Sequence, residues 1–432
     1  MQHTIPVEHW VKKIGPQTEE MASAIETCVH CGFCLAVCPT YQVLEEEPNS
    51  PRGRILLMRS VLEGDLTLQE AMPYLSPCRG CLACVTACPS GVHYGELITP
   101  FRAYARAKVP VGFMTHLQHT LVEQTLPYPG RFRSAAVLGR LIKPWSGILP
   151  EELQSMLSLL PEQLPVSQAM PALVEAVGAR RARAALLVGC VQQVLSPEIN
   201  WATTRVLAKN GVEVVIPEHQ CCCGALLMHT GDHEQARVLA RQNLRVFPED
   251  VDVVLTNAAG CGSGMKEYGL LFKGQPEEEK ASKFAHKVQD ISEFLFDLGL
   301  VQPSPLPQPL KAAYHDACHL THAQGISLEP RSLLSKIPNL TLLEIVDSSM
   351  CCGSAGTYNL EQPKIASELG ERKAKNILES GCEAIVTGNI GCMVQIRNHL
   401  QSLGKMLPIF HTIELMDMAY SNDGGSGSSD FQ

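Results

Sequence analysis

Long apolar runs, a leader pattern and an excess of basic residues are all missing from this 432-residue chain. No run reaches the roughly 18 apolar residues of a membrane-spanning helix, so we expect no such helix. The opening residues, MQHTIPVEHWVKK, carry charges with no apolar stretch behind them, which argues against a secretory signal peptide. The formal net charge of −9 argues against a nucleic-acid-binding protein.

A glycine-rich dinucleotide fingerprint is also missing, because no such loop follows a strand-like run and opens a helix. The chain is therefore not expected to bind a flavin itself. Cysteine, by contrast, is plentiful at 18 residues, too few for a small disulfide scaffold and too many for incidental core thiols. In the reducing, cytoplasmic setting that we expect, clustered cysteines indicate metal or redox chemistry.

Cysteine content, proline and charge divide the chain into parts. Two tight cysteine runs lie in the first hundred residues, and the stretch 101–185, with a net charge of +5, is the only basic one. Beyond it, strand-like and helical runs alternate, which favours α/β layers with parallel strands. We predict a multidomain α+β and α/β protein with a helical domain over 1–100, a basic helical segment over 101–183, α/β domains over 184–302 and 310–420, and a disordered tail over 421–432.

The two α/β domains are an internal repeat. Cys190 lies 128 residues before Cys318, and Cys222 lies 129 before Cys351. Around these landmarks QCCCGALL matches MCCGSAGT, and VVLTNAAGC matches AIVTGNIGC. The proline-rich stretch VQPSPLPQPL separates the copies as a semi-rigid linker. Since the carboxyl ends of parallel strands meet at one crevice, we expect the cysteines of each copy to gather there.

The first domain carries the spacing Cys-x2-Cys-x2-Cys-x3-Cys-Pro twice, from Cys28 and from Cys78. This is the bacterial ferredoxin spacing for [4Fe–4S] ligation, in which the fourth cysteine of each run serves the other cluster. A zinc ribbon explains neither the third x2 step nor Cys-Pro, and a disulfide framework does not suit the compartment. The predicted ligands are Cys28, Cys31, Cys34 and Cys88 for cluster 1, and Cys78, Cys81, Cys84 and Cys38 for cluster 2.

Each repeat supplies four further thiols, including a Cys-Cys-Gly pair that we expect to open a helix and so to favour the thiolate form. Additional iron–sulfur clusters and buried core thiols stay open as interpretations. Cys221 and Cys382 align with Met350 and Val251, so we predict both to be core thiols. The candidate further ligands are Cys190, Cys222, Cys223 and Cys261 in the first copy, and Cys318, Cys351, Cys352 and Cys392 in the second.

Several charged side chains and histidines lie near these motifs, and more than one role is open for them. Arg52 and Arg54 begin a helix that should close at Gly64, either as a solvated basic end or as cations that offset cluster charge. Histidines near the cysteines are interpreted as surface or packing residues, and His319 as a candidate for proton handling; they are His219, His229, His233, His315, His319 and His322. The basic segment has Arg131, Arg133, Arg140 and Lys143 beside Phe132, Leu141 and Trp145, and either an anionic membrane or a partner subunit suits it.

The order of two ferredoxin runs followed by two Cys-Cys-Gly domains resembles the iron–sulfur subunits of membrane-linked dehydrogenases. Within them, CVHCGFCLAVCPTYQVL, SPRGRILLMRSVLEGD, CPSGVHY, GCGSGMKEYG and CCGSAGTY are similar to the glycolate oxidase iron–sulfur subunit family. The resemblance covers nearly all of residues 20–420 and implies two [4Fe–4S] clusters. One departure is that Gly264 and Gln395 stand where heterodisulfide reductase has a further cysteine.

The resemblance also implies an enzyme complex in which this subunit is not catalytic alone. Two flavoprotein-type subunits would oxidise glycolate, a 2-hydroxy acid, to glyoxylate. This subunit would pass the electrons to a respiratory quinone or another membrane acceptor, from a position on the inner face of the cell membrane. The alternatives are the equivalent subunit of a lactate or anaerobic glycerol-3-phosphate dehydrogenase, and a heterodisulfide-reductase-like thiol redox enzyme.

Overall fold

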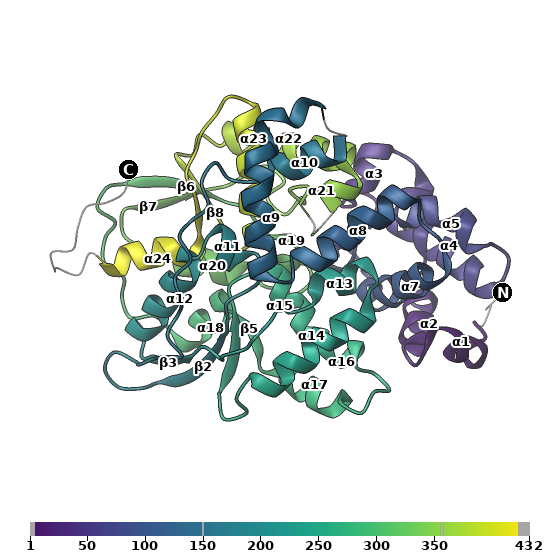
Figure 1. Cartoon of the computed structure of the whole chain (residues 1–432), viewed down its shortest axis with the longest axis horizontal. Coiled ribbons are helices and arrows are strands. Elements are labelled where there is room, and N and C mark those ends of the chain that lie inside the picture. Colours follow the sequence, from purple (N-terminus) through teal and green to yellow (C-terminus); the bar gives the residue numbers. More distant parts are fainter. Residues whose placement is uncertain (1–4, 149–150, 355, 357, 422–432) are drawn as a thin grey trace.

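The structure is a computed structural model that describes residues 5–148, 151–354, 356 and 358–421. Figure 1 shows short N-terminal helices gathered at one end of the molecule and two parallel sheets with their helices at the other. The combination of helical and α/β parts confirms the predicted fold class. The predicted tail lies outside the described residues except for Ser421, the last residue of the final helix.

The N-terminal domain consists of short helices around one apolar core in which Met21, Met58 and Leu97 are fully buried. The helix predicted after Pro51 is confirmed. Its Ser50 cap accepts a hydrogen bond from the Gly53 amide at 3.0 Å, and Gly64, with φ of +87°, ends it in the left-handed conformation. The elements are α1 (Val7–Ile14), α2 (Thr18–Glu26), α3 (Pro39–Leu44), the 3₁₀ turn Glu47–Asn49, α4 (Pro51–Glu63), α5 (Leu68–Leu75), α6 (Ala83–Thr86) and α7 (Tyr94–Lys108).

Helices make up most of the predicted basic segment, although α7 runs across its start and the short strand Leu173–Val174 near its end joins the first sheet. Its helices are α8 (Phe113–Thr125), α9 (Pro129–Ile142), the 3₁₀ helix Lys143–Ile148 and α10 (Glu151–Ser158). Glu123 pairs with Arg106 of α7, and Gln118 donates to the Leu360 carbonyl at 3.1 Å. Phe132 is buried, so it does not belong to the exposed apolar surface of this segment. Throughout the described ranges, no helix is both long and apolar enough to cross a bilayer.

The first repeat forms a five-stranded sheet in the order β1-β3-β2-β4-β5, parallel except for the edge pair β1 and β3. Its central strands are β2 (Ala182–Leu187), which is fully buried from Ala184 onwards, and β4 (Val253–Thr256), which is buried throughout, as is typical of strands covered on both faces. The other strands are β1 (Leu173–Val174), β3 (Val212–Val215) and β5 (Val288–Asp290), and the helices are α11 (Gln192–Leu195), α12 (Glu198–Lys209), α13 (Ala225–Thr230), α14 (His233–Val246), α15 (Ala259–Lys266), α16 (Tyr268–Leu271), α17 (Glu278–His286) and α18 (Ile291–Leu298).

The second repeat forms a fully parallel four-stranded sheet in the order β7-β6-β8-β9. Its centre pairs Ala312 with both Leu342 and Ala384, the same arrangement that the first sheet has. The strands are β6 (Leu310–Tyr314), β7 (Leu340–Leu343), β8 (Ala384–Thr387) and β9 (Ile409–His411), and the helices are α19 (Cys318–Thr321), α20 (Leu328–Leu334), α21 (Tyr358–Glu361), α22 (Pro363–Glu379), α23 (Ile390–Ser402) and α24 (Thr412–Ser421).

The two repeats share one hydrophobic core, which includes Leu186 of β2 and Ile385 of β8. The proline-rich linker between them packs into this core through Leu306. At the far end, α24 reaches back to α12, where Arg205 pairs with Asp417 at 2.6 Å. The repeats are therefore held in one fixed arrangement relative to each other.

Candidate metal centres

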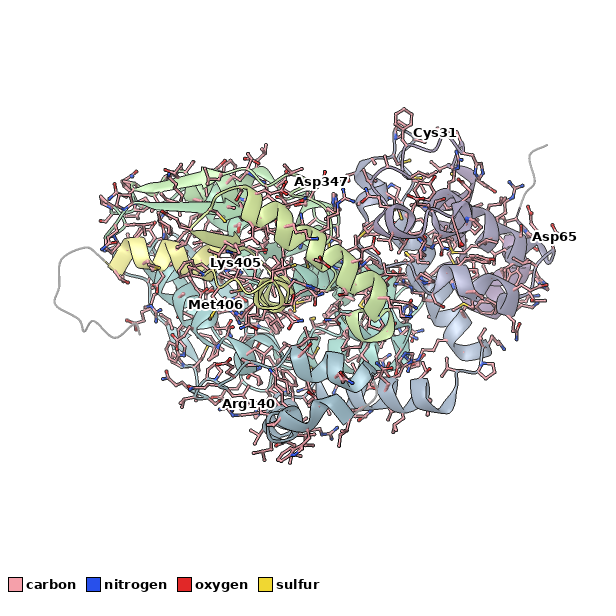
Figure 2. All side chains as sticks on the ribbon, turned by 90° about the horizontal axis from the view of Figure 1, so that it is seen from above. Cys31, Asp65, Arg140, Asp347, Lys405 and Met406 are labelled. Atoms are coloured by element: carbon pink, nitrogen blue, oxygen red, sulfur yellow. The ribbon has the colours of Figure 1, made fainter. Side chains whose placement is uncertain are left out.

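The first cysteine run surrounds an open hollow of about 420 Å³. Phe33 at its rim is 66% exposed, and Figure 2 shows Cys31 at the margin of the N-terminal domain. Partial burial raises the pKa of the Cys28 and Cys34 thiols, so a cation or metal is needed to hold them as thiolates. The thiols around this hollow are those predicted for cluster 1, namely Cys28, Cys31, Cys34 and Cys88, together with Cys84.

The second hollow, of about 320 Å³, lies deeper in the molecule. Burial raises the pKa of Cys81 strongly, whereas at Cys78 the effect of burial is outweighed by the nearby guanidinium groups of Arg54 and Arg102, which hold the pKa below its usual value. The thiols around this hollow are those predicted for cluster 2, namely Cys38, Cys78, Cys81 and Cys84.

The two hollows adjoin. Cys84, Pro51 and Tyr94 line both of them, so the two sets of thiols share part of their surroundings. The Tyr94 hydroxyl lies 3.7 Å from the Cys78 sulfur. This arrangement suits two centres that exchange electrons, because the shared wall keeps the distance between them short.

Buried arginines show that the second hollow fits an anionic group. Arg54, 1% exposed, donates to the Tyr74 carbonyl at 2.7 Å and to Thr40 at 2.9 Å, and lies 3.9 Å from the Cys38 sulfur. Arg79, 6% exposed, lies with its guanidinium 4.0 Å from the Tyr358 ring centre, and none of its nitrogens has a hydrogen-bond partner among the described residues. A buried cation without hydrogen bonds is costly even beside an aromatic ring, so it needs a nearby negative charge such as a thiolate-bound iron–sulfur cluster.

Sequence reasoning missed Arg79, although a signal was present. It is the only charged residue inside the second cysteine run, CRGCLACVTACP, and a charge within a metal-binding loop invites a role in balancing the cluster. For Arg54, the interpretation as part of a solvated helix end is wrong, since the side chain is buried against the thiols. Arg52 is half-buried; it pairs with Glu47 and donates to the His30 carbonyl at the first hollow.

In the first repeat the four candidate thiols come together after the strands, as predicted. Cys190 follows β2, the Cys222–Cys223 pair follows β3, and Cys261 lies on α15 after β4. The Cys190 and Cys222 sulfurs are 3.3 Å apart. Contacts with the neighbouring Cys222 and Cys261 thiols hold the pKa of Cys223 well below its usual value.

The second repeat places its thiols at the same strand ends. Cys318 begins α19 after β6, Cys351 and Cys352 follow β7, and Cys392 lies on α23 after β8. The pKa of Cys351 is lowered by Cys318 and Cys352 and further by Arg79. The pKa of Cys392 is lowered by Cys352 and further by His315.

The two Cys-Cys-Gly pairs lead into different local structures. In the first repeat, Gly224 leads directly into α13, as predicted. In the second, α21 begins only at Tyr358, so the expected helix does not open at the pair. A helix dipole therefore does not explain the lowered pKa of Cys351, which comes from its thiol neighbours and the arginine.

The second repeat, unlike the first, shares a buried cluster with the second hollow. Cys81 and Ala83 of the N-terminal domain pack against Cys318 and Cys351. Around this contact, His319 lies 3.1 Å from the Gly80 carbonyl, His322 lies 2.8 Å from Thr86 and the Tyr358 hydroxyl donates to the Pro77 carbonyl at 3.0 Å. These histidines hold the interface together, which agrees with a packing role for both.

The two cysteines predicted to be core thiols have backbone partners. Cys221 donates to the Leu239 carbonyl at 3.2 Å, and burial raises its pKa to about 12. Cys382 is buried and donates to the Ile377 carbonyl at 3.7 Å. At the positions where heterodisulfide reductase has a further cysteine, a side chain on Gly264 would collide with Ala225, and Gln395 pairs with His399 at 3.1 Å. Neither position offers a fifth thiol.

Comparison with known proteins matches these parts one by one. A family model described as a 4Fe-4S dicluster domain matches residues 24–92, and a cysteine-rich domain matches residues 184–266 and 312–397, which confirms the repeat. The chain is 36% identical over 415 residues to the glycolate oxidase iron–sulfur subunit of Escherichia coli (strain K12), covering 94% of this chain and 96% of that protein. The chain belongs to the glycolate oxidase iron–sulfur subunit family.

Two other relatives of this iron–sulfur subunit are also similar in sequence. A probable glycolate oxidase iron–sulfur subunit of Bacillus subtilis (strain 168) is 36% identical over 399 residues, covering 87% of this chain and 89% of that protein. Lactate utilization protein A of an Exiguobacterium species is 29% identical over 235 residues, which cover 54% of this chain and 96% of that protein. The family membership confirms iron–sulfur clusters as the cofactors and an iron–sulfur role within an oxidoreductase complex.

Proposed function

We propose that this chain is the electron-transfer subunit of a glycolate oxidase complex. It receives electrons from a flavoprotein subunit that oxidises glycolate to glyoxylate and delivers them towards a respiratory quinone. The observation that carries the proposal is the pair of adjoining thiol-lined hollows within a chain of this family. The sequence has no glycine-rich dinucleotide fingerprint, and the proposal therefore assigns the two-electron oxidation to partner chains.

We propose that the first hollow holds one [4Fe–4S] cluster and the second hollow another. Cys28, Cys31, Cys34 and Cys88 would hold the first, and Cys38, Cys78, Cys81 and Cys84 the second, so each run lends its last cysteine to the other centre. When bound, each cluster accepts and releases one electron, which lets the pair divide a two-electron donation. The arginines and Tyr94 stabilise the added negative charge.

The open rim of the first hollow is the proposed entry for electrons. Val29 and Phe33 are 68% and 66% exposed on either side of the exposed Cys31. Isolated apolar side chains of this kind suit the contact with a partner subunit, and the neighbouring thiols bring the first centre close to that contact. The thiols of the second hollow are more deeply buried: Cys38, Cys78 and Cys81 are each at most 8% exposed, and Cys81 packs against the second repeat.

The basic segment is the proposed membrane contact. On α9 and the following 3₁₀ helix, Leu138, Leu141 and Trp145 are 60 to 65% exposed next to the basic residues Arg140 and Lys143. Apolar side chains flanked by cations suit the surface of an anionic bilayer. Figure 2 shows Arg140 at the margin of the view opposite Cys31, so the membrane contact and the partner contact do not compete.

A vesicle experiment tests the membrane contact. The purified chain should sediment with vesicles containing anionic lipid, and be released by salt and by Leu141→Ser with Trp145→Ser. The exposed Val238 of α14, changed to Ser, serves as the control and should leave binding unchanged. Absence of sedimentation at low salt would assign this surface to a partner subunit instead.

Co-purification tests the proposed function itself. Isolation of the tagged chain without air should bring down flavoprotein partners, and the complex should reduce a quinone analogue with glycolate. The chain alone should not oxidise glycolate. If the complex turned over L-lactate and not glycolate, the equivalent role in a lactate system would replace the proposal, in line with the relative named for lactate utilisation.

A further inference from the structure

The two Cys-Cys-Gly sites differ by one histidine. His315 stands three residues before Cys318, at the carboxyl end of β6, and Leu187 holds the corresponding place before Cys190 in the first repeat. Both side chains are buried, His315 completely. An apolar residue therefore suffices at this position of the fold, and packing does not by itself require an imidazole.

The ring of His315 is directed at the thiols of its own repeat. A nitrogen of His315 and the sulfurs of Cys352 and Cys392 all lie within 4.8 Å of one another, and all three residues are buried. Neither ring nitrogen makes a hydrogen bond of ordinary geometry to any described residue. Buried imidazoles normally find a partner, so an unpartnered one beside two sulfurs points to a metal.

The surroundings of His315 also suit a ligand group. Asn389 donates to the Cys392 sulfur at 3.4 Å, which orients that thiol. Cys318 and Cys351 extend the set to four sulfurs, and the unpartnered Arg79 lies near Cys351. Thiolate and imidazole together are a ligand set typical of iron and zinc centres.

We propose that the second Cys-Cys-Gly site holds an iron–sulfur cluster to which His315 contributes a nitrogen ligand, whereas the first site is ligated by sulfur alone. This rests on the proposed function only in taking iron as the metal. His315 is a neutral donor, so it adds no negative charge to that of the four thiolates. The cationic Arg79 near Cys351 makes the second site the better electron acceptor of the two, and this site borders the second hollow.

Spectroscopy of the full-length chain, purified without air and reduced, tests the ligand directly. A pulsed paramagnetic-resonance spectrum should show strong nitrogen coupling that changes when the protein is grown on 15N-histidine. His315→Leu, which installs the residue of the first repeat, should abolish this coupling and reduce the iron content. His315→Cys should keep the iron, lose the coupling and shift the midpoint potential of that centre downwards.

A matched control is His399→Leu, which removes another buried imidazole of the second repeat, one that pairs with Gln395 rather than with a thiol. It should leave the coupling intact. The proposal is overturned if the wild-type chain shows no histidine coupling, if the coupling survives His315→Leu, or if the site contains zinc. None of these results would count against the proposed clusters of the eight N-terminal thiols. Failure of that proposal would instead appear as the absence of ferredoxin-type signals in the wild-type chain.

Discussion

The two ferredoxin-type hollows have the same cysteine spacing and opposite surroundings. The first is open, with Phe33 exposed at its rim and Arg52 half-exposed beside it. The second is lined by more deeply buried thiols, among them Cys81, which packs against the second repeat, and has Arg54 and Arg79 buried in its walls. Spacing determines which thiols meet, while burial and charge determine how readily the bound cluster takes an electron. The comparison assigns exchange with a partner to the first hollow and an internal step to the second.

Removing one thiol from each hollow gives the largest expected difference. Cys31→Ser and Cys81→Ser should each lose about half of the iron bound by the eight N-terminal thiols. Cys81→Ser should also lower the unfolding temperature markedly, because Cys81 is buried in the contact with Cys318, whereas Cys31 is exposed. Iron analysis and anaerobic thermal unfolding measure both effects. Equal unfolding temperatures for the two variants would contradict the difference in burial.

The arginines at the two hollows should differ next. Arg54→Gln removes a buried cation with several partners and should destabilise the fold by about 3–5 kcal/mol. It should also lower the midpoint potential of the centre in the second hollow, since a positive charge near the cluster favours the reduced form. Arg52→Gln should cost about 1 kcal/mol or less, because its ion pair with Glu47 is partly exposed. Denaturant unfolding and redox titration compare them, and a larger effect of Arg52→Gln would reverse the comparison.

Substitution of Arg79 should change the stability of the chain in opposite directions without and with bound iron. With iron removed, Arg79→Met should stabilise the chain by about 1–3 kcal/mol, since it eliminates a buried cation without hydrogen-bond partners in the described structure. With iron bound, the same change should destabilise it and lower the potential. Arg102→Met is the control: its guanidinium donates to the Cys78 and His229 carbonyls, so its loss should destabilise both forms. Destabilisation of the iron-free form by Arg79→Met would refute the charge-balance argument.

The smallest expected changes in stability and midpoint potential come from substitution of Tyr94, which borders both hollows. Tyr94→Phe removes the hydroxyl next to the Cys78 sulfur and should cost about 1 kcal/mol. It should lower the potential of the second centre slightly and leave the first unchanged. Tyr104→Phe on the same helix, where the ring packs against Trp10, is the control without a thiol neighbour. Equal shifts at both centres would show that Tyr94 acts through the shared wall instead.

Local patterns in the sequence predicted the N-terminal thiol sets, the α4 helix and the repeat. These are decided over short distances: three-residue steps bring cysteines to one side of a loop, and a capping Ser50 and a terminal Gly64 delimit a helix. Within each repeat, the strand-end positions of the cysteines followed from the parallel sheet.

Local sequence patterns could not predict the contacts between segments that are distant in the chain. The linker was expected to divide the repeats, yet the two share one core. The special positions of Arg79 and His315 were not recognised, because a side chain within a cysteine run or directly after a strand is only distinctive once its neighbours in space are known. Cys-Cys-Gly was expected to open a helix twice; Gly224 leads directly into α13, whereas Ser354 after the second pair is not helical.

The amino-acid order alone determined which sulfurs belong together, because the reach of a short peptide loop limits the partners that each thiol can meet. Only the folded arrangement decided that Cys31 at one centre is exposed while most thiols at the other are buried. One contact beside the buried centre joins Gly80 to His319 across 239 residues of chain. Contacts of that separation depend on how whole domains pack, and it is their packing that sets the burial and the charge around each cysteine set.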